Sequence, residues 1–107
     1  MNANSTVFEI EKILVISTAH LPSQEYLDEL SSNGAAPSRP RNFNLISIPT
    51  NYGVLVYVGG DSENFSRLIN HYSDISVILV KARELGCSWV NFDQDGSTYS
   101  IFTSWDW

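Results

Sequence analysis

The C-terminal run, residues 87–107, most constrains how this chain folds, because it contains all three tryptophans of the sequence. Two aromatic and β-branched stretches flank the segment Asp93-Gln-Asp-Gly96, and Asp and Gly in a short connection are typical of a hairpin turn. We therefore expect a C-terminal β-hairpin that ends in its most aromatic part. Large rings gathered at a terminus act either as core anchors or as a contact surface. Both alternatives stay open for Trp105 and Trp107.

Near the other end of the chain, Ile13-Leu-Val-Ile16 is a continuous apolar run bounded by polar residues. Such a run is typical of a strand buried on both faces in the centre of a sheet. A helix is predicted from about Pro22 or Ser23, which suit the first helical positions, to Ser31 or Ser32. Residues 43–48 and 52–58 are strand-like, and the short Gly- and Asn-containing connection between them indicates a hairpin.

A second helix is predicted to begin after Gly59-Gly60, with Asp61 or Ser62 as its N-cap. Apolar residues then recur at helical spacing, and Ser73-Asp74 can break or re-cap the helix. Residues 75–80 are rich in β-branched side chains and fit either a helix or a strand. We favour a helix because residues 81–86 form a strong helical ending with glycine at the position after the cap.

The predicted order of elements is β-α-β-β-α-β-β. It implies an α+β two-layer sandwich with a mostly antiparallel sheet and both helices on one face. A length of 107 residues indicates a single domain over residues 1–107. Residues 1–6 are polar and predicted to be loose, while residues 33–42, with two prolines and a glycine, are predicted to form a flexible loop.

The charge balance is acidic, with a formal net charge of −6 at pH 7. Because binding to a phosphate backbone needs clustered Lys and Arg, direct nucleic-acid binding is disfavoured. An acidic surface that binds a basic partner, or one that serves only solubility, fits better. The single cysteine, Cys87, excludes a disulfide framework, and no apolar stretch is long enough for a membrane span. With no secretory signal at its start, the chain is predicted to be cytoplasmic.

The first candidate site is Ser17-Thr18-Ala19-His20, where the first strand turns into the first helix. Such turns present backbone N–H groups and polar side chains at a sheet end, where ligands often bind. His20 would act there as a general base or hydrogen-bond donor, with Thr18 beside it. The alternative is that Thr18 and His20 only satisfy backbone groups where the helix begins. One histidine without a located partner is not a catalytic device, so we favour this structural interpretation.

Three further motifs are better explained by structure than by chemistry. Asp93 and Asp95 are spaced to share a hard cation, but the rest of a calcium-binding loop is missing and a hairpin turn is the better interpretation. Gly59-Gly60 precedes a helix but lacks a phosphate-binding pattern. Cys87 has no neighbouring cation in the sequence and is expected to be a small buried residue. We therefore expect no catalytic residue, no metal and no cofactor.

The aromatic terminus is the second main candidate. In alternating strands, bulky side chains such as Trp89 and Phe92 would lie on both faces of the hairpin. If helices cover one face only, some of these rings are exposed, and exposed aromatic patches mark contact surfaces. The alternative is that Trp105 and Trp107 complete the core of a small domain. An exposed edge strand in the hairpin would also allow a symmetric homodimer by strand addition.

Several short pieces of the chain together resemble a small bacterial family known only as a domain of unknown function. They are Ile16-Ser-Thr-Ala-His-Leu21, Lys81-Ala-Arg-Glu-Leu-Gly-Cys87, Trp89-Val-Asn-Phe-Asp-Gln-Asp-Gly96 and Asp106-Trp107. Members of that family are often carried by plasmids, prophages and other mobile elements. The resemblance implies no activity, but it favours a bacterial accessory role connected with mobile DNA.

These observations lead to two functional hypotheses. The first is a non-enzymatic accessory protein that binds and modulates another protein, such as a host or defence protein, through Trp89, Trp105 and Trp107. The second is a small enzyme or ligand-binding domain centred on Ser17, Thr18 and His20. It predicts a concave pocket at that sheet end, with His20 facing a carboxylate such as Asp93 or Asp95.

Overall fold

The computed structural model describes residues 7–32 and 44–107. Within these residues the chain forms β1 (Lys12–Ser17), the short 3-10 helix η2 (Thr18–His20), α1 (Gln24–Ser31), β2 (Ser47–Thr50), β3 (Gly53–Tyr57), α2 (Ser62–His71), the 3-10 turn η3 (Ser73–Ile75), α3 (Ser76–Glu84) and β4 (Cys87–Asp93). The α+β class is confirmed. The predictions of a loose segment at 1–6 and a flexible loop at 33–42 lie outside the described residues.

The four described strands form one mixed sheet in the order β1-β4-β3-β2. β1 is parallel to β4, while β3 is antiparallel to both β4 and β2. The sheet is therefore mixed, and the prediction of a mostly antiparallel sheet needs correction. β1 and β4, the first and last strands along the chain, are parallel neighbours. The prediction that Ile13–Ile16 forms a central strand is wrong, since β1 lies at an edge of the described sheet.

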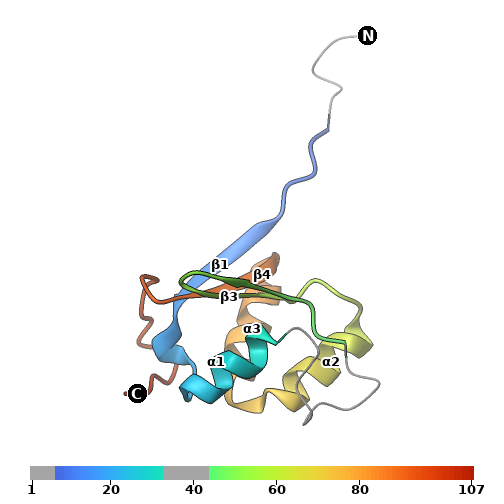
Figure 1. Ribbon diagram of the computed structural model, residues 1–107. Coiled ribbons are helices and arrows are strands. Elements are labelled where there is room, and N and C mark those ends of the chain that lie inside the picture. Colours follow the sequence, from blue (N-terminus) through green and yellow to red (C-terminus); the bar gives the residue numbers. More distant parts are fainter. Residues whose placement is uncertain (1–6, 33–43) are drawn as a thin grey trace.

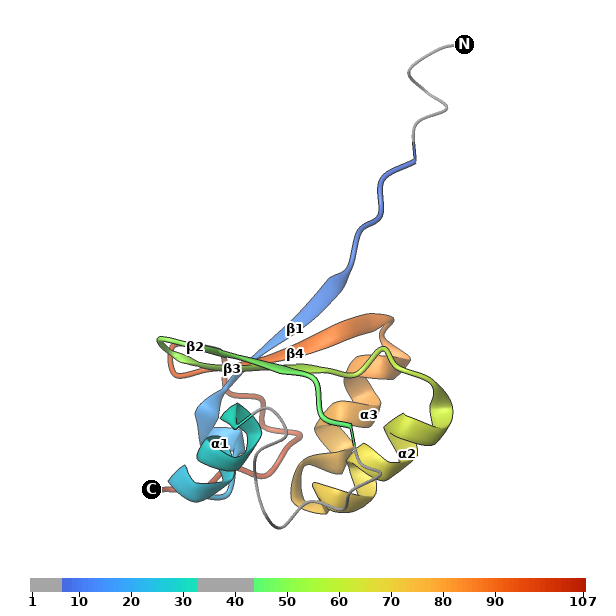
Figure 2. The same ribbon diagram turned by 45° about the vertical axis from the view of Figure 1, so that its right-hand side comes forward.

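Figures 1 and 2 show all three α-helices on the same side of the sheet. Several strand residues that point to this side are fully buried, namely Ile16, Val54, Val56, Val90 and Phe92. Leu30 of α1, Leu68 of α2 and Leu79 of α3 pack into the same core. This arrangement leaves the opposite side of the sheet, here called the outer face, without a described helix over it (Figure 2).

Local signals account for where the helices begin and end. The Ser23 hydroxyl accepts the Tyr26 N–H at the start of α1, and the Asp61 carboxylate accepts the Asn64 N–H at the start of α2. Such caps satisfy backbone donors that have no partner within the helix. Residues 76–80 are helical, as favoured from the sequence, and Gly86 ends this segment with a φ of +82° that glycine readily adopts. The interruption at Ser73-Asp74 is also present, as η3.

The predicted C-terminal hairpin is wrong, and with it the predicted order of elements. The turn at residues 93–96 forms, since the Asp93 carbonyl accepts the Gly96 N–H at 2.8 Å. After it, however, residues 97–107 form turns and irregular backbone with no strand. Gly96 passes so close to β1 that an added Cβ would lie 2.7 Å from the Ile16 carbonyl carbon. The chain then continues past the end of β1 toward α1 (Figure 1).

No helix within residues 7–32 and 44–107 is long and apolar enough to cross a membrane.

Candidate functional site

The C-terminal tail, residues 97–107, is held against the segment from Val15 to Leu21 by a series of hydrogen bonds. The Ser97 carbonyl accepts the Ser17 N–H at 2.8 Å, and the Ala19 carbonyl accepts the Trp105 N–H at 2.8 Å. The Tyr99 hydroxyl donates to the Val15 carbonyl at 3.0 Å. The tail therefore satisfies its polar backbone on the strand-to-helix turn instead of in a sheet.

His20 is the centre of this attachment. Its ring is fully buried, between Tyr99 at 6.4 Å and the edge of Phe102 at 6.0 Å between ring centroids. Its Nε2 accepts the Tyr99 N–H at 2.9 Å, which leaves Nδ1 to donate to the Thr103 carbonyl at 2.7 Å. Both ring nitrogens are thus occupied by main-chain groups of the tail, as in the neutral tautomer with the proton on Nδ1.

In this geometry His20 cannot be the general base or ligand-binding group of the second hypothesis. A general base needs a free nitrogen within reach of a substrate, and neither nitrogen of His20 is free. Its hydrogen-bond partners are the backbone groups of Tyr99 and Thr103, whereas the Asp93 carboxylate accepts the Asp95 N–H within its own turn. His20 is a structural residue that anchors the tail.

A surface pocket of about 470 Å³ nevertheless lies at this end of the sheet. Thr18 and Trp107 both line it, so the structure brings two of the sequence-predicted residues together. The other lining residues come from α1 and from the β2–β3 turn with its neighbours: Gln24, Leu27, Asp28, Ser31, Pro49, Thr50, Asn51, Tyr52, Gly53 and Gln94. Sequence reasoning missed this contribution, because no local pattern shows that the β2–β3 turn faces α1.

Trp107 forms a fixed but accessible wall of the pocket. Its indole Nε1 donates to the Leu21 carbonyl at 2.7 Å, although the residue is 48% exposed. Asp28 is exposed on α1, where its carboxylate accepts the Gln24 side-chain amide at 3.0 Å. Among residues 7–32 and 44–107, neither Lys nor Arg lines the pocket. The described site therefore combines an aromatic face, hydroxyl and amide groups, and one carboxylate.

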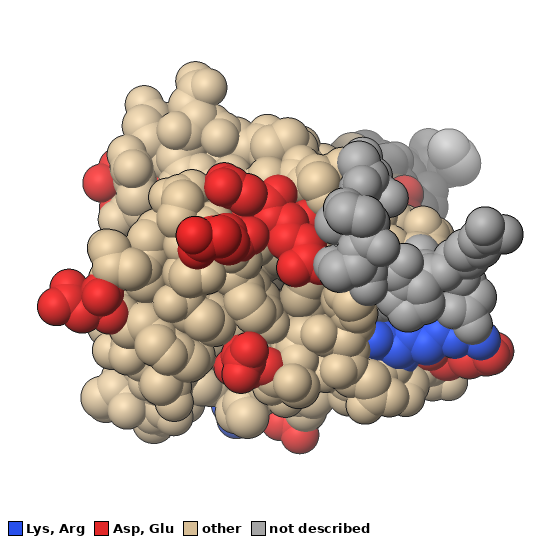
Figure 3. Space-filling model, turned by 60° about the horizontal axis from the view of Figure 1, so that its bottom comes forward, with Lys and Arg blue, Asp and Glu red and all other residues tan. Residues whose placement is uncertain are grey.

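The surroundings of the pocket are also acidic. Glu25 and Asp28 are exposed on α1, and Asp106 is exposed in the tail. Figure 3 shows the helix side of the molecule, where acidic side chains are spread over the surface and Lys and Arg are visible only near its margin. Such a field attracts cationic groups and repels anions.

Trp89 does not belong to this site. It lies on β4, on the outer face of the sheet, where its ring meets Tyr57 edge-on at 5.0 Å between centroids. Trp89 and Trp107 therefore do not share one site, and a contact role for the tryptophans stays a prediction. Once the tail leaves the sheet after Asp93, it carries Trp105 and Trp107 away from Trp89.

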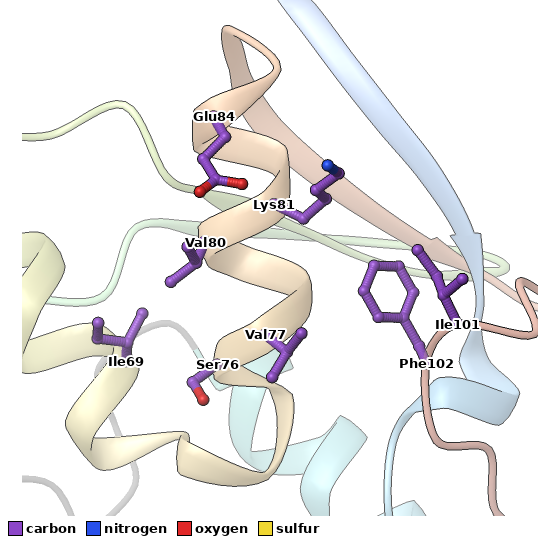
Figure 4. A pocket seen from close by; sticks show the side chains of 8 residues that line it. All are labelled: Ile69, Ser76, Val77, Val80, Lys81, Glu84, Ile101 and Phe102. Carbon is purple, nitrogen blue, oxygen red and sulfur yellow. The ribbon is translucent and has the colours of Figure 1, made fainter.

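A second concavity of about 470 Å³ runs along α3 beside the tail. Figure 4 shows Val77 and Lys81 of α3 on the side of Ile101 and Phe102 of the tail, while Val80 points toward Ile69 of α2. Its walls are mostly apolar, and it contains none of the residues predicted from the sequence.

The remaining sequence candidates have structural roles. The Arg83 guanidinium donates to the carbonyls of Val58 and Gly60 at 2.8 and 2.7 Å, so the Gly59-Gly60 turn is tied to α3. Within the described residues, no cluster of His, Cys, Asp and Glu could hold a metal ion. Cys87 is a free thiol that is only half-buried, so the expectation of a buried residue at this position needs correction.

Fold and site define a small acidic α+β domain with a half-polar surface pocket beside a C-terminal tryptophan. The chain belongs to the family of unknown function DUF5983, because the C-terminal domain of that family matches residues 13–107. No curated protein and no solved structure matches it.

Proposed function

We propose that this chain is a non-enzymatic accessory protein of a bacterial mobile element, which acts by binding and modulating another protein. The pocket beside Trp107 is its contact site, and the partner inserts a basic side chain there. The observation that carries this proposal is the indole of Trp107, which is half-exposed and yet fixed by its hydrogen bond to Leu21. A ring that is already ordered loses little conformational freedom on binding, and tryptophans of this kind dominate binding energies.

The chemistry of the pocket supports a cationic group in the partner. The face of an indole attracts an ammonium or guanidinium group, and the Asp28 carboxylate would pair with the same charge. The hydroxyl groups of Thr18 and Thr50 would accept hydrogen bonds from the N–H groups of this cation that Asp28 leaves unpaired. The net charge of −6 would steer a basic partner toward the domain over longer distances.

The biological setting of the proposal rests on the resemblance of the sequence to proteins of plasmids and prophages. An accessory protein of a mobile element acts on proteins of its host or of competing elements, so a host or defence protein is the partner class that we propose.

Substitution of Trp107 tests the proposal. The wild-type protein and its Trp107→Ala variant would be immobilised, exposed to bacterial lysate and compared by quantitative mass spectrometry. The partner found would then be purified and titrated by calorimetry. We expect Trp107→Ala to weaken binding about 10- to 100-fold, a typical loss for a tryptophan at the centre of an interface. Asp28→Asn should weaken it less and reduce its salt dependence.

Ile101→Ala is the matched control, because Ile101 is an exposed apolar residue of the same tail outside the pocket. It should bind as the wild type does. Equal binding by Trp107→Ala and the wild type, or the absence of any saturable partner, would contradict the proposal.

A second candidate function uses the same pocket, because Thr18 lines it at the strand-to-helix turn as the ligand-binding hypothesis expects. In this case a small cationic molecule, such as a polyamine, would occupy it. The geometry favours binding over catalysis, since His20 has no free nitrogen. Thermal stabilisation of the wild type by spermidine, with no stabilisation of Trp107→Ala, would support this candidate over protein binding.

A further inference from the structure

The outer face of the sheet is apolar across all four strands. Register places its side chains in two rows, one containing Ile13, Trp89 and Tyr57 and the next containing Val15, Leu55 and Ile48. Ile46 extends the first row, because its carbonyl accepts the Tyr57 N–H. No described helix covers these seven side chains (Figure 2). An apolar face of this kind on a small domain marks a contact surface.

Asn91 is the one polar side chain within these two rows, opposite Val15 and Leu55. Its Oδ1 is shielded from solvent and accepts no hydrogen bond among the described residues. Because neighbouring groups already cover this oxygen, it adds little polar surface to the two rows.

The segment that precedes β1 also has exposed apolar side chains. Residues 7–11, here called the arm, precede β1 and extend away from the body of the domain (Figures 1 and 2). Val7, Phe8 and Ile10 are 91, 76 and 82% exposed. Phe8 and Ile10 alternate with Glu9 and Glu11, which is the pattern of a strand with one apolar side and one charged side.

The dimensions of arm and face match. Neighbouring strands lie about 4.8 Å apart and a strand rises about 3.3 Å per residue, so four strands span about 14 Å and five arm residues about 17 Å. An arm laid across the face would therefore reach from one edge strand to the other.

The arm is poorly built to cover the face of its own chain. To do so it would have to reverse direction before β1, and residues 7–16 contain no Gly, Pro, Asn or Asp. These are the residues that make tight turns favourable. The Trp89 indole also contacts Glu11, with 3.4 Å between Nε1 and Oε2, and so holds the base of the arm in line with β1.

Stacking of two bare faces is also insufficient. The face is four strands, or about 14 Å, wide and, with β3 of five residues, about 17 Å long. It offers on the order of 250 Å² in plan, whereas stable interfaces bury about 800 Å² on each partner. Exchange of the arms instead makes two arm–face contacts, one on each copy, and removes the exposure of Phe8 and Ile10.

We propose that the occupant of the outer face is a second copy of this chain, whose arm lies across the face while its own face receives the first copy's arm. The contact is isologous, so it closes on itself as a two-fold dimer. It uses none of the residues that line the pocket at Trp107. It also differs from dimerisation through a C-terminal hairpin, since that hairpin does not form.

Charge makes the proposed dimer sensitive to salt. Each copy has a net charge of −6, and each arm brings Glu9 and Glu11 to its partner. Repulsion between two acidic copies is screened by salt, so dimerisation should strengthen as ionic strength rises. Binding of a basic partner at the Trp107 pocket should weaken under the same change.

Light scattering after gel filtration, over a series of concentrations, tests the proposal. We expect the wild type to pass from monomer to dimer. The arm variant Phe8→Ser/Ile10→Ser and the face variant Ile48→Lys should each raise the dissociation constant about a hundredfold or more. All three substituted residues are exposed, so folding is preserved. Val77→Ser, at an equally exposed apolar position on α3, is the control and should dimerise normally.

A mixing experiment distinguishes arm exchange from other dimers. The arm variant retains an intact face, and the face variant retains an intact arm, so their mixture restores one arm–face contact. We expect it to contain heterodimers at concentrations where each variant alone is monomeric. A wild type that stays monomeric at every concentration and salt would overturn the proposal. So would an arm variant that dimerises like the wild type, or a mixture without heterodimers.

Discussion

The two faces of the sheet are built from the same four strands and have similarly apolar side chains, yet only one is covered by described helices. On the covered face Val56, Val90 and Phe92 are fully buried, whereas on the outer face Ile13, Val15 and Ile48 remain almost half-exposed. Alternation therefore places side chains on two faces but does not decide which face becomes core. The position of the helices determines which face is core. Substitutions on the covered face should therefore lower the free energy of unfolding much more than substitutions on the outer face.

The largest expected effect concerns the C-terminal tail, residues 97–107, which packs on the molecule without being a strand of the sheet. His20→Ala removes a fully buried ring and two hydrogen bonds to the tail. We expect a loss of about 3 kcal/mol in the free energy of unfolding, measured by urea denaturation, and faster proteolysis of residues 97–107. Thr103→Ala is the control because its carbonyl, which accepts the hydrogen bond, is kept. An unchanged stability in His20→Ala would show that the tail is not anchored as described.

A matched pair of substitutions tests the two faces directly. Val56→Thr buries an unpaired hydroxyl on the covered face, which should cost about 1–3 kcal/mol. Val15→Thr makes the same change on the outer face, where water can reach the hydroxyl, and should alter stability by less than about 0.5 kcal/mol in the monomer. Both free energies would be measured by urea denaturation at concentrations below dimerisation. Equal losses at the two positions would mean that the outer face is covered within one copy.

The smallest effect at neutral pH concerns Tyr26, whose ring packs 5.7 Å from Tyr72 on the helix side. Burial, with the Asp74 carboxylate, raises the pKa of the Tyr26 hydroxyl well above its ordinary value of 10.0. The unfolded chain would ionise at this position near pH 10 while the folded chain would not. The contribution of Tyr26 to the free energy of unfolding is therefore fully present below pH 10. Above pH 10 it falls by roughly 1 kcal/mol per pH unit. Tyr26→Phe should show a shallower loss between pH 10 and 11, as followed by thermal unfolding; identical slopes would exclude Tyr26 as the cause.

Most elements could be predicted because their signals are local. The caps at Ser23 and Asp61 and the ending at Gly86 act within a few residues, so the helices lie close to where the sequence placed them. The position of β1 could not be predicted in this way. An apolar run such as Ile13–Ile16 fits a central strand and also an edge strand with an uncovered apolar face.

The tail could not be predicted because its partners are distant. Residues 97–107 alternate as a strand would, but their backbone groups bond to His20, Ser17 and Ala19. Nothing near Tyr99 in the sequence indicates that a histidine ring will accept its N–H. For the same reason, Thr18 and Trp107 could each be singled out from the sequence, while the pocket that they share with the β2–β3 turn could not.

The parallel pairing of β1 with β4 also governs how the chain is made. β1 is synthesised first among the strands, but its described partner in the sheet is synthesised last, and the tail that packs on its end follows later still. Contacts between such distant segments close large loops, so folding is expected to be slow for a domain of this size. On the ribosome β1 stays unpaired until almost the whole domain has emerged, and a chain interrupted before β4 leaves the sheet open and exposed to proteolysis.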